Sequence, residues 1–132
     1  MTVFLDASVV IYLIEQPAVF GPNALARVTA LQAGGDQLVV SDLVRMECQV
    51  GPLKSGNHAL LSQFTVFFTT GAGVQSITPA LCDRAAAIRA AHGFKALDAL
   101  HLAAAVEHGC GLFLTADAQL ARFPDIAVEV LS

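Results

Sequence analysis

Charged residues are scarce in this sequence. Asp, Glu, Lys and Arg make up 14% of its 132 residues and apolar residues make up 55%, whereas typical soluble domains have about 25% and about 45 to 50%. This composition excludes an intrinsically disordered or low-complexity chain. The surplus of apolar side chains predicts that another subunit covers part of the surface, most simply in a homodimer.

A long apolar run is also missing. The longest one, from Val9 to Ile14, is far shorter than the roughly 18 residues that a membrane-spanning helix needs. The N-terminal segment lacks Lys and Arg, and Asp6 interrupts its apolar residues, so we expect no signal peptide. Cys48, Cys82 and Cys110 are odd in number and share no Cys-x-x-Cys spacing, which predicts buried thiols in a reducing compartment. Together with the short apolar runs, this predicts a cytoplasmic protein that does not contact a membrane.

Basic residues are too few for the large positive surface that is typical of nucleic-acid-binding proteins. Seven Lys and Arg stand against 11 Asp and Glu, and the net charge is -4. This balance lowers the expectation of a nucleic-acid ligand without removing it. Carboxylates that bind metal ions depress the sum, while the bound cations that neutralise them are not part of the sequence.

The motifs of several common enzyme classes are absent. The chain has no Gly-x-x-x-x-Gly-Lys phosphate loop, no Gly-x-Gly-x-x-Gly dinucleotide turn, no Gly-x-Ser-x-Gly nucleophile elbow and no zinc-type spacing of His and Cys. The segment Asp6-Ala7-Ser8 is similar to the strand-end aspartate of aspartyl-phosphate phosphatases. Those enzymes usually carry a second Asp where this chain has Ser8. A small-molecule phosphohydrolase with Asp6 as its nucleophile is therefore an alternative function.

Apolar patterns and capping residues predict that strands alternate with helices. Strands are expected at residues 3–5, 37–40, 74–77, 112–114 and 126–130. Helices are expected at residues 8–15, 22–33, 42–50, 58–68, 79–92 and 97–107, with a short helical turn at 116–121. Gly51-Pro52 is expected to end the third helix. With no repeat or linker, this order predicts one domain over residues 1–132, with a mostly parallel central sheet in a three-layer α/β/α architecture.

Four acidic residues stand among residues that we expect to be buried: Asp6, Glu47, Asp98 and Asp117. An ionised carboxylate is strongly disfavoured in an apolar environment unless it finds hydrogen bonds, a cationic partner or a metal ion. Asp6 and Asp117 follow predicted strands, while Glu47 and Asp98 lie near the starts of predicted helices, so a parallel sheet brings all four to one edge. Carboxylate oxygens suit Mg²⁺ or Mn²⁺. The pattern therefore predicts metal-assisted phosphodiester hydrolysis.

Each of these carboxylates also has an ordinary structural interpretation. Asp6 and Asp98 could cap their helices, and Asp117 could belong to a turn. Glu47 could pair with one of two nearby basic residues, Arg45 or Lys54. The hypothesis of a site depends on all four residues together.

Polar residues beside the carboxylates are candidates for supporting roles. Ser8 and Thr115 could orient the carboxylates or hold metal-bound water, and Ser41 could do the same or cap a helix. His101 follows Asp98 by three residues, on the same face of a helix. We favour a structural or site-lining histidine at this position over a metal ligand.

In this order and spacing, the motifs resemble those of PIN-domain ribonucleases, specifically the VapC-type toxins of bacterial toxin-antitoxin pairs. The resemblance covers nearly the whole chain and rests on Asp6-Ala-Ser, Ser41-Asp-Leu-Val-Arg-Met-Glu47 with Val50-Gly-Pro-Leu53, Leu97-Asp98-Ala-Leu-His101, and Leu114-Thr115-Ala-Asp117 with Phe123. It implies a PIN-like fold and a Mg²⁺- or Mn²⁺-dependent endoribonuclease that cleaves RNA. It also implies a homodimer and a VapB-type antitoxin whose tail enters the site.

The resemblance also assigns roles. Asp6, Glu47, Asp98 and Asp117 match the acidic catalytic and metal-binding quartet of the family, with Asp117 as a ligand or as a support through water. Two neighbours depart from the pattern, because Ala7 replaces a hydroxyl residue and Ala116 replaces an Asn. Contacts to the RNA backbone are expected from Arg45, Lys54, Arg84, Arg89 and Lys95. A non-catalytic PIN-fold binding module is the alternative to an enzyme.

Overall fold

A five-stranded, fully parallel sheet forms the centre of the computed structural model, which describes residues 1–132. Its strands are β1 (Thr2–Leu5), β2 (Gln37–Ser41), β3 (Gly73–Gln75), β4 (Leu112–Thr115) and β5 (Val128–Val130). Their order in the sheet is β3-β2-β1-β4-β5. The chain therefore builds outward from β1 to β3 and then returns to the other side of β1. This reversal sets the carboxyl ends of β1 and β4 next to each other, where open α/β sheets bind ligands.

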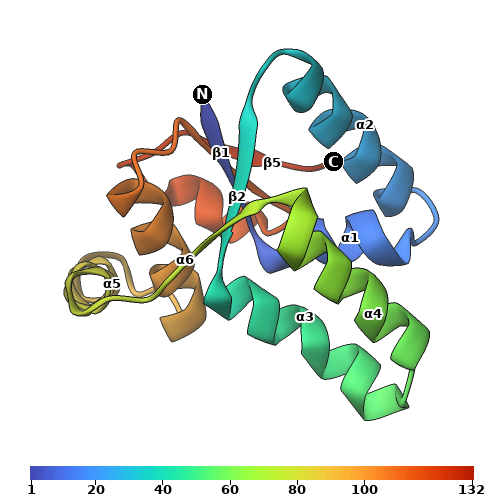
Figure 1. Cartoon of the computed structure of the whole chain (residues 1–132). Helices are drawn as coiled ribbons and strands as arrows, with labels where there is room; N and C mark the ends of the chain where they lie inside the picture. Colours follow the sequence, from blue (N-terminus) through green and yellow to red (C-terminus); the bar gives the residue numbers. More distant parts are fainter.

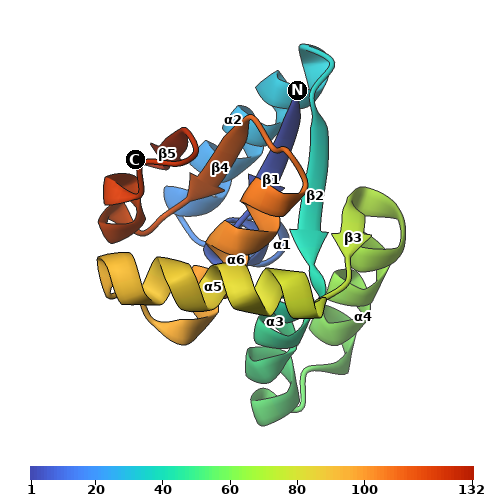
Figure 2. The same ribbon diagram turned by 90° about the vertical axis from the view of Figure 1, so that its left-hand side faces the viewer.

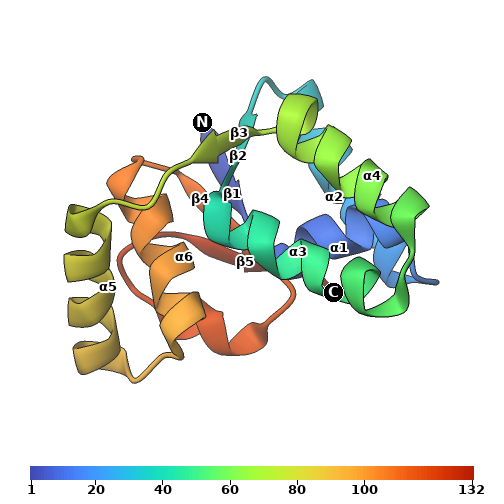
Figure 3. The same ribbon diagram turned by 60° about the horizontal axis from the view of Figure 1, so that its bottom comes forward.

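Six helices and two short helical segments connect the strands. They are α1 (Ala7–Glu15), α2 (Phe20–Ala33), α3 (Asp42–Ser55), α4 (His58–Val66), the π-helical turn η1 (Phe67–Gly71), α5 (Pro79–His92), α6 (Ala96–Glu107) and the 3-10 helix η2 (Ala118–Arg122). Helices α5 and α6 lie on one side of the sheet, and α1 and α2 lie on the other (Figures 1 and 3). The predicted three-layer α/β/α architecture is confirmed.

The strands point toward the end of the molecule where α3 lies (Figure 2). At that end β1 passes directly into α1 through Asp6, whose backbone N–H donates to Leu114 O at 3.0 Å. The pairing of β1 with β4 thus continues one residue beyond the strand. This extra hydrogen bond fixes the position of Asp6 relative to the exit of β4.

The middle of the sheet is covered on both faces. Val3, Phe4 and Leu5 of β1 are completely buried, and the Phe4 and Phe113 rings stack across β1 and β4 with centroids 5.3 Å apart. Helix α6 contributes the buried alanines Ala103–Ala105. Their small side chains allow the helix to approach its neighbours closely. The edge of the sheet at which β1 and β4 end therefore rests on fully buried residues of these two strands.

Two predicted helix boundaries are wrong. Helix α3 continues through Pro52 to Ser55 and ends at Gly56, whose φ of +67° is the left-handed conformation that glycine adopts readily. A proline removes one helical hydrogen bond, but the Pro52 ring is buried near the end of the helix. Helix α2 begins at Phe20 rather than Pro22. Proline fits anywhere in a first turn, where backbone N–H groups have no helical partner.

The connection between α1 and α2 is sharply bent. Gln16 adopts the left-handed conformation, and Val19, at φ 71° and ψ -59°, forms a γ-turn in which Phe20 N donates to Ala18 O at 2.9 Å. At Gly21 an added Cβ would lie 2.6 Å from the Cα of Gln16.

No helix by itself has the length and apolar composition of a membrane span. Helices α1 and α2 together have that composition, but they are bent by 108° relative to each other.

Candidate active site

Asp6 occupies the exit of the central strand and is only 7% exposed. It caps α1, with Oδ1 accepting a hydrogen bond from the Ala7 N–H at 2.8 Å, and its Oδ2 accepts one from Thr115 Oγ1 at 2.6 Å. Burial raises the pKa of Asp6 above its ordinary value, although nearby His101 and these hydrogen bonds act in the opposite direction. The capping interpretation is therefore confirmed, and the same carboxylate lies at the strand edge where a site was expected.

Hydroxyl groups join the exits of β1 and β4. Thr115 is completely buried, and besides donating to Asp6 its Oγ1 accepts the Asp117 N–H at 3.0 Å. Ser8 Oγ accepts the N–H of Ala116 at 3.1 Å. Both predicted supporting residues thus hold the loop after β4 against the start of α1. The hydrogen bonds fix the backbone from which Asp117 projects.

Asp117 and Asp98 approach the same edge from different elements. Asp117 is exposed and caps η2, where its Oδ1 accepts the Gln119 N–H at 2.9 Å, as the turn interpretation expected. Asp98 lies in the first turn of α6, but Lys95 occupies the capping position, so the capping interpretation of Asp98 is wrong. Burial raises the pKa of Asp98, and the charges of Asp6 and Asp117 raise it further. These effects show that the three carboxylates share one electrostatic environment.

Glu47 reaches this environment from α3. Its Oε1 pairs with Nε2 of His101, and not with either Arg45 or Lys54. The His101 side chain is 1% exposed, and its Nε2 also lies 3.9 Å from Oδ1 of Asp6. Asp6 and Glu47, which are 41 residues apart in the sequence, therefore converge on the same nitrogen atom. The sequence alone does not predict this pairing, which depends on how α3 packs beside α6.

The charges at this edge are poorly compensated. No Lys or Arg forms an ion pair with any member of the quartet, although Arg27 and Arg84 pair with acidic residues elsewhere. In this arrangement no three His, Cys, Asp or Glu side chains lie close enough together to ligate one ion. The donor chemistry nevertheless fits Mg²⁺ or Mn²⁺, because Mg²⁺ usually binds through one or two carboxylates and keeps several waters. Asp6 and Glu47, with Asp98 and Asp117 nearby, would supply such oxygen ligands.

Other candidate groups around the edge have structural roles. Ser41 precedes α3, but its hydroxyl makes no capping hydrogen bond and is buried without a partner. Burial raises the pKa of the Cys48 thiol to about 12, which makes it a packing group and not a nucleophile. Cys48 and Cys110 are buried as predicted, whereas Cys82 is exposed. Helix α5 buries the stripe of Leu81, Ala85 and Ile88, and position 82 lies off that stripe.

Three of the predicted RNA-contacting residues lie on or next to the helices that carry Glu47 and Asp98. Arg45 is half-buried on α3, with its guanidinium carbon 5.9 Å from the centroid of the Phe68 ring. Lys95 is exposed at the start of α6, three residues before Asp98. Lys54 is also exposed, but it lies in the last turn of α3, away from the sheet. Arg45 and Lys95 are thus the best placed of the five.

The remaining two are engaged elsewhere. Arg84 pairs with Glu107 at 2.5 Å, at the opposite end of α6 from Asp98. That separation is about 13 Å along a helix of 1.5 Å rise per residue. Arg89 donates from Nε to the Phe94 carbonyl at 3.0 Å. A further basic residue that was not predicted, Arg122, is exposed at the end of η2.

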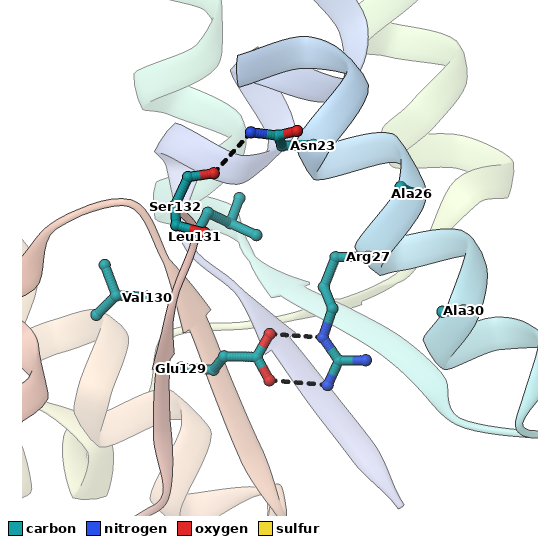
Figure 4. Close-up of a pocket in the computed structure, with 8 residues that line it drawn as sticks. All are labelled: Asn23, Ala26, Arg27, Ala30, Glu129, Val130, Leu131 and Ser132. Atoms are coloured by element: carbon teal, nitrogen blue, oxygen red, sulfur yellow. Dashed lines mark hydrogen bonds and ion pairs between the residues drawn. The ribbon is translucent and has the colours of Figure 1, made fainter. Parts of the chain in front are cut away.

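The hollow between α2 and β5 contains none of the quartet (Figure 4). Its polar groups already have partners, because Arg27 Nε and Nη2 pair with the two Glu129 carboxylate oxygens at 2.5 and 2.7 Å. Asn23 Nδ2 donates to the Ser132 carbonyl at 2.7 Å. This hollow is therefore separate from the candidate site at the edge formed by β1, β4, α3 and α6.

Comparisons with known proteins agree with this fold. The sequence model of the PIN domain family matches residues 3–126. Comparison with curated proteins gives no match. Among solved structures, a chain of VapBC2 from Rickettsia felis bound to a promoter DNA fragment superposes with a TM-score of 0.82 at 17% identity over 100% of each chain.

Two further structures are similar in fold. A chain of a toxin-antitoxin complex from Klebsiella pneumoniae has a TM-score of 0.73 at 24% identity over 95% of each chain. VapC20 of Mycobacterium tuberculosis, a Sarcin-Ricin loop cleaving toxin, has a TM-score of 0.72 at 19% identity, covering 95% of this chain and 98% of its own. The family match spans nearly the full length and includes all four carboxylates, so the protein belongs to the PIN domain family.

Proposed function

We propose that this protein is a divalent-metal-dependent endoribonuclease and the VapC-type toxin of a toxin-antitoxin pair. The observation that carries the proposal is the gathering of Asp6, Glu47, Asp98 and Asp117 at one edge with no Lys or Arg ion-paired to them. Crowded carboxylates, of which Asp6 is buried and Glu47 and Asp98 are partly buried, are costly unless a cation binds there. Structural neighbours that belong to toxin-antitoxin complexes, and one that is a Sarcin-Ricin loop cleaving toxin, support the same assignment.

The side chains divide the work of RNA cleavage among them. Asp6, Glu47 and Asp98 would hold Mg²⁺ or Mn²⁺, and Asp117 would hold it directly or through water. The bound ion would supply an activated water molecule and would neutralise charge on the phosphate oxygens. Thr115 fixes the rotamer of Asp6 through its hydrogen bond. Arg45 and Lys95 would contact the RNA backbone on either side of the carboxylates.

A cleavage assay tests this function. The purified chain, free of antitoxin, is incubated with structured RNA in the presence of Mg²⁺ or Mn²⁺ and, separately, EDTA. We expect cleavage that requires the metal and is lost in Asp98→Asn. Asp83→Asn is the matched control, because Asp83 is an exposed acidic residue of α5 outside the site.

Each alternative function has its own outcome in this assay. Cleavage that survives both EDTA and Asp98→Asn contradicts the proposal. RNA binding without cleavage by a metal-loaded chain favours the non-catalytic binding module. A phosphorylated Asp6 after incubation with a small phosphate ester favours the phosphohydrolase.

The proposed partners are a VapB-type antitoxin and a second copy of the chain. Met46, Val50 and Leu53 of α3 are 47%, 44% and 61% exposed and recur at helical spacing. Such an apolar stripe is suited to a two-fold contact, in which both subunits present the same surface. We expect a dimer in sedimentation at tens of micromolar, and a monomer for Val50→Lys. A wild type that stays monomeric contradicts the homodimer.

A further inference from the structure

His101 is a buried polar side chain that the mechanism above leaves without a task. It lies one turn after Asp98 on α6, and its ring is tilted against the Phe4 ring with centroids 6.1 Å apart. Nε2 contacts Oε1 of Glu47 and lies 3.9 Å from Oδ1 of Asp6. Nδ1 is buried and has no hydrogen-bond partner in the protein.

The unequal surroundings of the two ring nitrogens indicate where the proton lies. With the proton on Nε2, the ring donates to Glu47 and leaves only a lone pair unpaired at Nδ1. With the proton on Nδ1 alone, a buried N–H would lack an acceptor and the Nε2 lone pair would face a carboxylate oxygen. A buried N–H without a partner is the rarer and costlier defect. His101 therefore presents an N–H donor whose direction is set by the packing of its ring.

Glu47 depends on this donor. Its side chain is 29% exposed, and no Lys or Arg pairs with it. Without His101 the flexible Glu side chain would sample several rotamers, many of them directed into solvent, and binding a cation would require that freedom to be lost. The His101 hydrogen bond holds Oε1 near Asp6, while Oε2 has no hydrogen bond within the protein.

We propose that His101 is a positioning residue that holds the Glu47 carboxylate beside Asp6, so that both carboxylates face one divalent cation. The inference rests on the proposed function, because it assigns a purpose to the orientation of two of its ligands. Groups that orient metal ligands through hydrogen bonds typically change metal affinity or activity by 10- to 100-fold when they are lost. His101 acts through Glu47 and does not touch the RNA.

The test compares two substitutions of similar volume. His101→Gln retains an N–H donor near the position of Nε2, whereas His101→Leu has none. Mn²⁺ binding is measured on the full chain by electron paramagnetic resonance of the free ion. We expect the dissociation constant to rise about 10- to 100-fold in His101→Leu and to stay close to the wild-type value in His101→Gln. Equal affinities in all three proteins, or equal losses in both variants, overturn the proposal.

A spectroscopic result separates positioning from ligation. If His101 itself bound the ion, electron spin echo measurements on bound Mn²⁺ would show the nuclear modulation of a coordinated imidazole nitrogen in the wild type and not in His101→Leu. That result overturns the positioning role. Absence of the modulation, together with the loss of affinity in His101→Leu, supports it.

A metal-free cycle keeps the proposal independent of RNA cleavage. Urea unfolding in EDTA is compared for wild type, His101→Leu, Glu47→Leu and the double variant. If His101 holds Glu47, the double variant unfolds at a higher urea concentration than the sum of the single shifts predicts. Additive shifts overturn the proposal even when the wild type cleaves RNA. Coupled shifts with a wild type that does not cleave RNA leave the positioning role standing and contradict the proposed function instead.

Discussion

Thr115→Val is the sharpest test of how the site is held together. Valine has the shape of threonine without its hydroxyl, so the substitution removes the 2.6 Å hydrogen bond to Asp6 and the acceptor of the Asp117 N–H. A hydrogen bond to a charged group contributes about 1.5 to 3 kcal/mol. Thr115 is completely buried, and water cannot replace its hydroxyl at Asp6. We therefore expect Thr115→Val to lower the free energy of unfolding by about 2 to 3 kcal/mol at neutral pH.

Thr115→Ser is the matched control, because it keeps the hydroxyl and removes only a methyl group. Its cost should be about 1 kcal/mol, the value for one buried methyl group, and it should not depend on pH. Both variants are unfolded with urea in the presence of EDTA, at neutral and at mildly acidic pH. The difference between them isolates the hydrogen bond to the carboxylate.

The pH dependence has a definite sign. Burial raises the pKa of Asp6 in the folded protein, so the folded state holds this proton more tightly than the unfolded chain does. The stability that this proton contributes is present below the unfolded pKa and is lost as the pH rises through the folded pKa. Losing the hydroxyl raises the folded pKa further. The cost of Thr115→Val should therefore be largest at neutral pH and should shrink in acid. A cost that is the same at both pH values, or the same as that of Thr115→Ser, refutes the reasoning.

Three other substitutions test separate parts of the structure. Asp98→Asn should abolish cleavage and raise the melting temperature of the metal-free protein at neutral pH, because burial and neighbouring charges disfavour the ionised Asp98 side chain and raise its pKa. A melting temperature in EDTA at neutral pH that is lower than that of the wild type would count against a crowded carboxylate site. Glu129→Gln should cost less than about 1 kcal/mol, since the side chains of Arg27 and Glu129 are 38% and 34% exposed. The ion pair lowers the pKa of Glu129, so the difference from wild type in urea unfolding should vanish as the pH falls through that lowered value, and a difference that persists in acid would contradict it. Gly21→Ala should lower the free energy of unfolding by about 1 to 3 kcal/mol, because its Cβ would lie 2.6 Å from the Gln16 backbone. An unchanged free energy in chemical unfolding would show that the backbone between α1 and α2 shifts to accommodate the methyl group.

Local patterns were sufficient to predict the order of strands and helices. Thr78 before Pro79 predicts the start of α5, and the structure confirms it with a hydrogen bond from the Leu81 N–H to Thr78 Oγ1 at 3.2 Å. Pro52 misleads the same reasoning, because burial of its ring outweighs one lost helical hydrogen bond. Helix signals of this kind depend on neighbours in sequence, so they fail where tertiary packing decides.

The side-chain contacts at the site were less accessible to sequence reasoning. Position at a strand exit predicts the place of Asp6, but the pairing of Glu47 with His101 joins residues 54 positions apart. It depends on the relative placement of α3 and α6, which no local pattern encodes. The same limit applies to Arg84, whose partner Glu107 lies on another helix and keeps it at the far end of α6.

The topology explains why a protein with so few charges concentrates negative charge at one edge. The strand order reverses between β1 and β4, and this sets Asp6 and the loop carrying Asp117 side by side. Burial raises the pKa values of Asp6 and Asp98, and neighbouring carboxylates raise them further. The carboxylates can stay close together because the residues of β1 and β4 that precede them are almost completely buried, and this packing holds the backbone in place. An edge that is strained without a cation and relieved by one is suited to binding metal, and it ties the stability of this fold to the occupation of its site.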